Sequence, residues 1–170
     1  MSESASKPVF LVDARSEPVV VRIDGRACFS NSNCLRDFVT EMVAQGKRRF
    51  VLDFQQCGGV DSTFLGVLAG AALALKKAGP DSSFVAARVG DRNLELMRNL
   101  GLHRLLTIDM GDGAVNAQAC QTALDCKKLS EIENARLVLE AHETLGDVDE
   151  ANRAKFQDVV TFLRARVREG

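Results

Sequence analysis

The stretch RFVLDFQQCGGVDSTFLGVLAGAALALKKA, residues 49–78, decides the fold of this 170-residue chain. Its first six residues, RFVLDF, form a compact and mostly apolar run, which predicts a buried strand. A glycine turn at 58–59 follows it, and the apolar segment 64–78 then predicts a long helix. Because many residues of this segment are small, the helix can lie close against a sheet.

Strands and helices alternate on both sides of this stretch. Such an alternation is typical of an α/β domain with a mostly parallel core. We therefore expect a mixed sheet of four or five strands with helices on one side. The further predicted elements are strands at 9–12, 19–23, 83–87 and 105–108, a helix between Asn31 and Gly46, and a helix at 91–100.

The composition of the chain changes after residue 112. Apolar residues then recur at helical spacing on either side of Gly146, and a variant capping box begins at Asp147, so we expect a C-terminal helical hairpin. The predicted division is a disordered leader over 1–8, an α/β domain over 9–112 and a C-terminal helical extension over 113–170. The apolar stripe comprises Leu124, Leu129, Ile132, Leu139, Phe156, Val159, Val160 and Leu163.

The apolar stripe of the hairpin is too large to leave in water. It can be covered by the bare face of the sheet in the same chain or by a second chain. The Gly111-Asp112-Gly113 segment is a flexible joint that would let the hairpin swing away from its own domain. We therefore favour a homodimer through the hairpin.

Composition excludes several classes of function. The net charge of −1 and the absence of Trp and Tyr argue against a nucleic-acid binder. No apolar run reaches the roughly 20 residues that a membrane span needs, and the first residues do not resemble a secretory signal, so we expect a cytoplasmic protein without membrane insertion.

Cysteines and histidines give little support for a metal site. The five cysteines include no C-x-x-C pair, and the two pairs that lie six residues apart have the wrong spacing for zinc, so we expect free, mostly buried thiols in a reducing compartment. His103 and His142 are interpreted as plain surface residues, and the arginines at 164, 166 and 168 as a solvated helix face. No metal, cofactor or catalytic triad is predicted.

Asp61, Ser62 and Thr63 lie where the buried strand and turn deliver the chain to the long helix. Asp61 is placed to cap the helix, and the two hydroxyls fall in the first turn. Backbone N–H groups and the positive end of the helix dipole point there, so they would stabilise a phosphoryl group on either hydroxyl. The group would add about −1.5 to −2 charges, which is the physics of a phosphorylation switch.

At this point the chain resembles the STAS domain family, which is found in anti-sigma factor antagonists and in the tails of sulphate transporters. The order of elements matches over roughly residues 9–110. Three stretches carry the resemblance: VVVRIDG at 19–25, RRFVLDF with GVDST at 48–54 and 59–63, and LMRNLGLHRLLTI at 96–108.

The resemblance implies a protein that binds an anti-sigma factor serine kinase when unphosphorylated and thereby releases a sigma factor. The kinase would phosphorylate Ser62 with ATP, and a phosphatase would reverse the step. Asp61 matches the acid that precedes the phosphoacceptor, and Thr63 matches the neighbouring hydroxyl. Such a protein acts by binding, with no catalytic activity and no cofactor of its own.

Two positions near Ser62 depart from the family pattern. The family usually has Gly after D-S-[ST], where this chain has Phe64. Many members also carry an acid at the position of Cys28, and an aromatic at 64 is expected to reshape the kinase-docking face. These departures favour an alternative, a degenerate STAS scaffold or dimerisation module that is not phosphorylated. A further alternative is an accessory subunit of a lipid or anion transport system.

Overall fold

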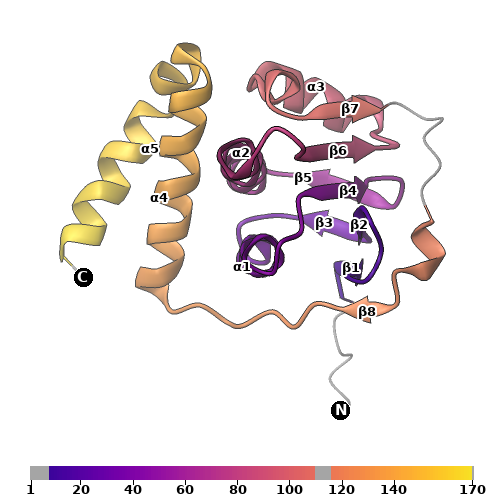
Figure 1. The fold of residues 1–170 in the computed structure, drawn as a ribbon. Coiled ribbons are helices and arrows are strands. Elements are labelled where there is room, and N and C mark those ends of the chain that lie inside the picture. Colours follow the sequence, from indigo (N-terminus) through magenta and orange to yellow (C-terminus); the bar gives the residue numbers. More distant parts are fainter. Residues whose placement is uncertain (1–7, 110–115, 170) are drawn as a thin grey trace.

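The computed structural model describes residues 8–109 and 116–169 (Figure 1). The predicted leader therefore lies outside the described residues except for Pro8, and so does the predicted joint at 111–113. None of the described helices is long and apolar enough to cross a bilayer. Among the same residues, no cluster of His, Cys, Asp and Glu could hold a metal ion.

The core of the molecule is a six-stranded mixed sheet in the order β7-β6-β4-β2-β1-β8. Strands β2, β4, β6 and β7 run parallel to one another, and β1 and β8 are antiparallel to their neighbours. A separate parallel pair, β3 with β5, leads into the helices. The bounds are β1 Phe10–Asp13, β2 Val19–Ile23, β3 Gly25–Ala27, β4 Arg49–Asp53, β5 Cys57–Val60, β6 Ser83–Ala87, β7 Thr107–Asp109 and β8 Thr122–Ala123.

The sheet has six strands, where four or five were expected. The additional edge strand is β8, whose two residues pair with Leu11 and Val12 of β1. It comes from the segment that was assigned to the helical extension. A two-residue strand has no alternating apolar pattern, so periodicity could not reveal it. The α/β class and the mixed, mostly parallel sheet are confirmed.

Helices α1 (Ser32–Ala44) and α2 (Ser62–Ala78) cover one face of the sheet, and α3 (Asp91–Asn99) lies towards its β7 end (Figure 1). The inner side of α2 packs Phe64, Leu65 and Leu68 into the main core. On the outer side of α2, Val67 is also buried. A helix that is apolar all round requires cover on both sides.

A C-terminal hairpin provides the outer cover and forms a third layer (Figure 1). Its helices are α4 (Glu131–Val148) and α5 (Glu150–Glu169). Leu137 and Ala141 of α4 form a small apolar cluster with Val67, and Leu129 packs against this cluster. The expected hairpin is confirmed, but it packs on the helix layer of its own chain rather than on the bare face of the sheet.

Both ends of α4 differ from the prediction. Ser130 caps the helix in a capping box with Glu133, so Leu124 and Leu129 precede the helix instead of lying in it. Hydrogen bonding to the Ser130 backbone lowers the pKa of the Glu133 carboxyl. At the other end, α4 continues past Gly146 to Val148, and Asp149, rather than Asp147, accepts a bond at the start of α5.

Strand β4 ends in a buried carboxylate, Asp53, which is 1% exposed. Arg88 neutralises it with two hydrogen bonds, from Nε to Oδ1 at 2.9 Å and from Nη2 to Oδ2 at 2.5 Å. The pairing raises the pKa of the Arg88 guanidinium. Arg88, the residue that follows β6, makes this ion pair from a backbone with φ = 55°, which a non-glycine residue seldom adopts.

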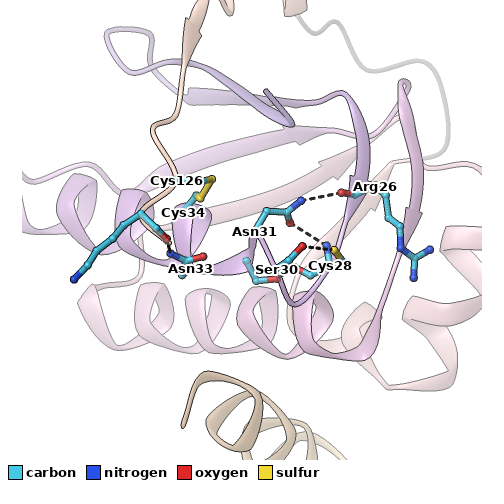
Figure 2. The surroundings of a disulfide bond; sticks show 9 residues. Arg26, Cys28, Ser30, Asn31, Asn33, Cys34 and Cys126 are labelled. Atoms are coloured by element: carbon cyan, nitrogen blue, oxygen red, sulfur yellow. Dashed lines mark hydrogen bonds between the residues drawn. A yellow bond between two sulfur atoms is a disulfide. The ribbon is translucent and has the colours of Figure 1, made fainter. Parts of the chain in front are cut away.

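Cys34 of α1 and Cys126 form a disulfide across 92 residues of sequence (Figure 2). Next to it, Asn33 Nδ2 donates to the Lys127 carbonyl at 2.9 Å. The prediction of unpaired thiols is therefore wrong for this pair, because spacing arguments compare only cysteines that are close in sequence. The remaining three cysteines are not bonded to one another. The disulfide fastens the segment that precedes α4 to the first turn of α1.

We expect Cys126→Ser to lower the free energy of unfolding by about 2–4 kcal/mol, because the disulfide closes a long loop. Urea unfolding without reductant measures the loss, and Cys28→Ser serves as the control because Cys28 is not in a disulfide. With dithiothreitol, wild type and Cys126→Ser should unfold at the same midpoint. Identical midpoints without reductant would contradict the disulfide.

Candidate functional site: the first turn of helix α2

Asp61 organises the start of α2. Its backbone is extended, with φ = −117° and ψ = 175°, and its Oδ1 accepts a hydrogen bond from Phe64 N at 2.9 Å. Its second oxygen, Oδ2, accepts from Phe29 N at 2.8 Å. One carboxylate therefore caps the helix and also holds the loop between β3 and α1 against it, as the sequence predicted for the cap.

Ser62 follows as the first helical residue, and its side chain is partly exposed. Its Oγ lies 2.8 Å from Nε2 of His142, which α4 brings across from 80 residues further along the chain. His142 is only 5% exposed. The interpretation of His142 as a surface residue is therefore wrong, whereas His103 is exposed as expected.

The second nitrogen of His142 fixes the direction of this hydrogen bond. Nδ1 lies 2.7 Å from the Val138 carbonyl oxygen, which can only accept, so Nδ1 carries a proton. In the neutral imidazole, Nε2 then has the lone pair and the Ser62 hydroxyl donates to it. The Phe156 ring of α5 packs edge-on against the imidazole at a centroid distance of 4.8 Å.

Ser62 and His142 have the spacing of a nucleophile and a base. No histidine base was predicted near Ser62, but His142 occupies this position. The group that orients the imidazole is a backbone carbonyl, where catalytic triads use a carboxylate. What the arrangement achieves directly is to hold the hydroxyl in one rotamer, directed towards α4.

The other predicted site residues take different positions. Thr63 is 4% exposed, so its hydroxyl is covered, while Ser62 is partly open. Phe64 is fully buried between Phe10 and Phe54, with ring centroids 6.0 and 6.5 Å away. It therefore points into the core, and the prediction that it reshapes the docking face is wrong.

Cys28 belongs to the loop that precedes α1 rather than to the immediate contacts of Ser62. Its Sγ lies 3.1 Å from Ser30 Oγ, and its backbone N–H donates to Asn31 Oδ1 (Figure 2). The following residue, Phe29, makes the contact with Asp61. The loop therefore reaches the first turn of α2 through a backbone amide.

The open side of Ser62 faces a cavity of about 220 Å³ whose lining includes Leu96 of α3 and Lys155 and Phe156 of α5. Leu96 and Phe29 are two of the few large apolar side chains that are exposed, at 37% and 49%. The site thus combines one hydroxyl, one lysine and two exposed apolar groups around a helix N-terminus.

Sequence reasoning missed three of these groups: His142, Phe29 and Lys155. For His142 a signal existed, because it lies three residues before Leu145 and four after Val138, on the buried face of a predicted helix. Phe29 was the only aromatic in its predicted loop. Nothing in the sequence places Lys155 near Ser62, because that contact depends on how α5 folds back.

Comparison with known proteins agrees with this architecture. A family model described as "Mlab, STAS domain" matches residues 10–107, more than half of the chain. The chain belongs to the STAS domain family. Residues 108–170, including the α4–α5 hairpin, lie outside the matched STAS domain. No curated protein sequence matches the chain significantly.

Solved structures share the STAS fold at low sequence identity. A candidate anti-sigma factor antagonist from Thermotoga maritima matches with a TM-score of 0.50 and 16% identity over 67% of this chain and 92% of that one. The unphosphorylated anti-sigma factor antagonist SpoIIAA gives 0.50 and 16% over 65% and 93%. The phosphorylated form of the Bacillus cell fate determinant SpoIIAA gives 0.50 and 16% over 65% and 95%. At this identity the likeness concerns the fold.

Removing the Asp61 carboxylate should loosen both segments that it holds. We expect Asp61→Ala to lower the free energy of unfolding by about 1–2 kcal/mol, the usual loss for a helix N-cap. Urea unfolding measures this loss. Asp91→Ala is the matched control, because Asp91 lies in the first turn of α3 but does not cap it. Equal losses in the two variants would contradict the special role of Asp61.

Proposed function

We propose that this protein is an anti-sigma factor antagonist that binds an anti-sigma factor serine kinase and is switched off by phosphorylation of Ser62. The observation that carries the proposal is the position of Ser62, the first residue of a helix whose N-cap is Asp61. Together with the STAS fold, this is the placement that the family resemblance assigns to the phosphoacceptor. The function is binding, without a cofactor.

The chemistry of the first turn suits a phosphoryl group. The Ser62 oxygen would attack the γ-phosphorus of ATP, the bond to ADP would break, and the hydroxyl proton would pass to a base. The product would add about −1.5 to −2 charges beside helix N–H groups and near Lys155, which lines the adjoining cavity. These groups can accommodate the anion without moving α2.

The same charge would disfavour a docked partner. Leu96 lines the cavity beside Ser62, and Phe29, whose backbone amide bonds to Asp61, is also exposed. Both offer apolar contact to a partner, and burial of a dianion in such an interface is costly. A phosphatase would restore binding by removing the phosphoryl group. Because the reaction uses ATP, we place it in the cytoplasm, although a disulfide such as Cys34–Cys126 is uncommon in that compartment.

A second candidate function is that of an accessory subunit of a lipid or anion transport system, in which other STAS domains occur. The observation that favours it is the hydrogen bond that already occupies the Ser62 hydroxyl. In that case the face around Phe29 and Leu96 would bind a transport protein without any phosphorylation. A degenerate scaffold, dimerised through the hairpin, would likewise leave Ser62 unmodified.

Incubation with the cognate kinase and ATP should add one phosphoryl group, located by mass spectrometry on the peptide that contains residue 62. We expect Ser62→Ala to abolish incorporation. Thr63→Val is the control, because it removes the neighbouring hydroxyl at similar volume and should leave incorporation within about twofold. Incorporation that survives Ser62→Ala would refute the assignment. Binding to a permease-associated protein, with no kinase substrate activity, would support the transport alternative.

A further inference from the structure

The hairpin of α4 and α5 is an addition to the STAS domain that lies on the outer side of α2. The matched family domain ends at residue 107, whereas α4 begins at Glu131. Figure 1 shows α2 between the sheet and α4. The half of α2 that α4 crosses is the half that begins with Ser62.

Gly66 makes this crossing possible. A Cβ atom at position 66 would lie 2.4 Å from the Ala141 carbonyl oxygen and 2.7 Å from the Ala141 Cβ. Only glycine therefore allows α4 to approach α2 this closely. In an uncovered helix, Gly in place of Ala costs about 1 kcal/mol, so this residue is suited to the covered state. One turn later, a Cβ at Gly70 would meet only Thr144 Cγ2, at 4.0 Å.

The hairpin is fastened at two further places. At the α4–α5 turn, the buried Asn152 donates from Nδ2 to the carbonyls of Leu145 and Leu100, both at 2.9 Å, which joins the turn to the end of α3. Before α4, the Cys34–Cys126 disulfide joins the approach segment to α1 (Figure 2). The hairpin is thus held to all three helices of the STAS domain.

The two helices of the hairpin are also bound to each other. Arg164 of α5 donates to Glu143 Oε2 of α4 at 2.8 and 3.1 Å, and Arg166 pairs with Glu131. Both arginines are exposed, as the sequence predicted for a solvated helix face, and their ion pairs also join α5 to α4. The Phe156 ring of α5 also packs against the His142 ring of α4.

We propose that the α4–α5 hairpin is an intramolecular cover of the Ser62 face, held by the Ser62–His142 hydrogen bond and the Gly66–Ala141 crossing. The hairpin engages the hydroxyl of the partly exposed Ser62 through His142, and a kinase or docking partner gains full access to that hydroxyl in the fraction of molecules whose hairpin is lifted. That this face is a phosphorylation and docking site rests on the proposed function. The cover itself rests only on the contacts between the hairpin and α2.

With such a cover, the fraction of molecules whose hairpin is lifted controls how readily a partner binds at Ser62. A partner that binds only the open form has an apparent dissociation constant equal to the intrinsic value divided by that fraction. A partner that contacts α2 and also the released hairpin would shift the equilibrium by its preference for the open form. The hairpin would thereby set the threshold at which Ser62 is phosphorylated.

A thiol at position 62 reports the opening without any kinase. In Ser62→Cys the thiol is a weaker donor to His142, so the Gly66–Ala141 crossing is the contact that holds the cover in this background. Alkylation by iodoacetamide is followed by mass spectrometry of the peptide that contains residue 62. Burial raises the pKa of the Cys57 and Cys120 thiols, which slows their reaction and lowers the background. Adding Gly66→Ala should raise the alkylation rate at position 62 by about tenfold or more, because α4 can no longer seat.

Gly70→Ala in the same background is the matched control. It adds the same methyl group to the same helix in ordinary contact distance, so the rate should stay within about twofold. Ala141→Glu is the second variant, made from the hairpin side, and should also raise the rate by about tenfold. Equal rates in the parent, Gly66→Ala and Ala141→Glu, with circular dichroism showing a folded domain in each, would overturn the cover.

The kinase assay separates this inference from the proposed function. With Ser62 in place, Gly66→Ala should be phosphorylated about tenfold faster than wild type, and Gly70→Ala at the wild-type rate. If no kinase acts on Ser62 while alkylation still responds to Gly66→Ala, the proposed function fails and the cover stands. If phosphorylation is equally fast in all variants and alkylation does not respond, the cover fails and the proposed function stands.

Discussion

A helix that is apolar around its whole circumference has to be buried on both sides, and α2 is such a helix. The sheet buries the side that carries Phe64, Leu65 and Leu68. The opposite side, with Val67, requires a second apolar surface, which Leu137 and Ala141 of α4 supply. Burial of each large apolar side chain stabilises the fold by about 1.5–3 kcal/mol, so this contact determines where the hairpin lies. The contact between Ser62 and His142 follows from that placement.

Much of the STAS domain could be predicted from the sequence, because its elements carry local signals. The alternation of strands and helices, the cap at Asp61 and the end of α3 before Gly101 each depend on a few consecutive residues. The two-residue β8 carries no such signal, so the sheet was expected to be smaller than it is. The hairpin was also expected, because the spacing of apolar residues is enough to predict helices rich in Ala, Leu and Glu.

The candidate site was predictable only on the α2 side. Asp61 and Ser62 belong to one short stretch, whereas His142 lies 80 residues away from Ser62 and Cys126 lies 92 residues away from Cys34. Contacts of this kind depend on how layers pack, and no pattern within one element encodes them. Phe64 shows the opposite error, since a departure from a family motif suggested a surface change where the side chain fills the core.

The contact between His142 of α4 and Ser62 of α2 is the feature on which the proposed cover most depends. Long-range ¹H–¹⁵N correlation NMR of the histidine rings tests this directly, with His103 as the exposed reference in the same spectrum. We expect neutral His142 to carry its proton on Nδ1, and the Nε2 resonance to shift in Ser62→Ala while the resonances of His103 do not change. An Nε2–H tautomer at His142, or ring resonances that do not respond to Ser62→Ala, would contradict it.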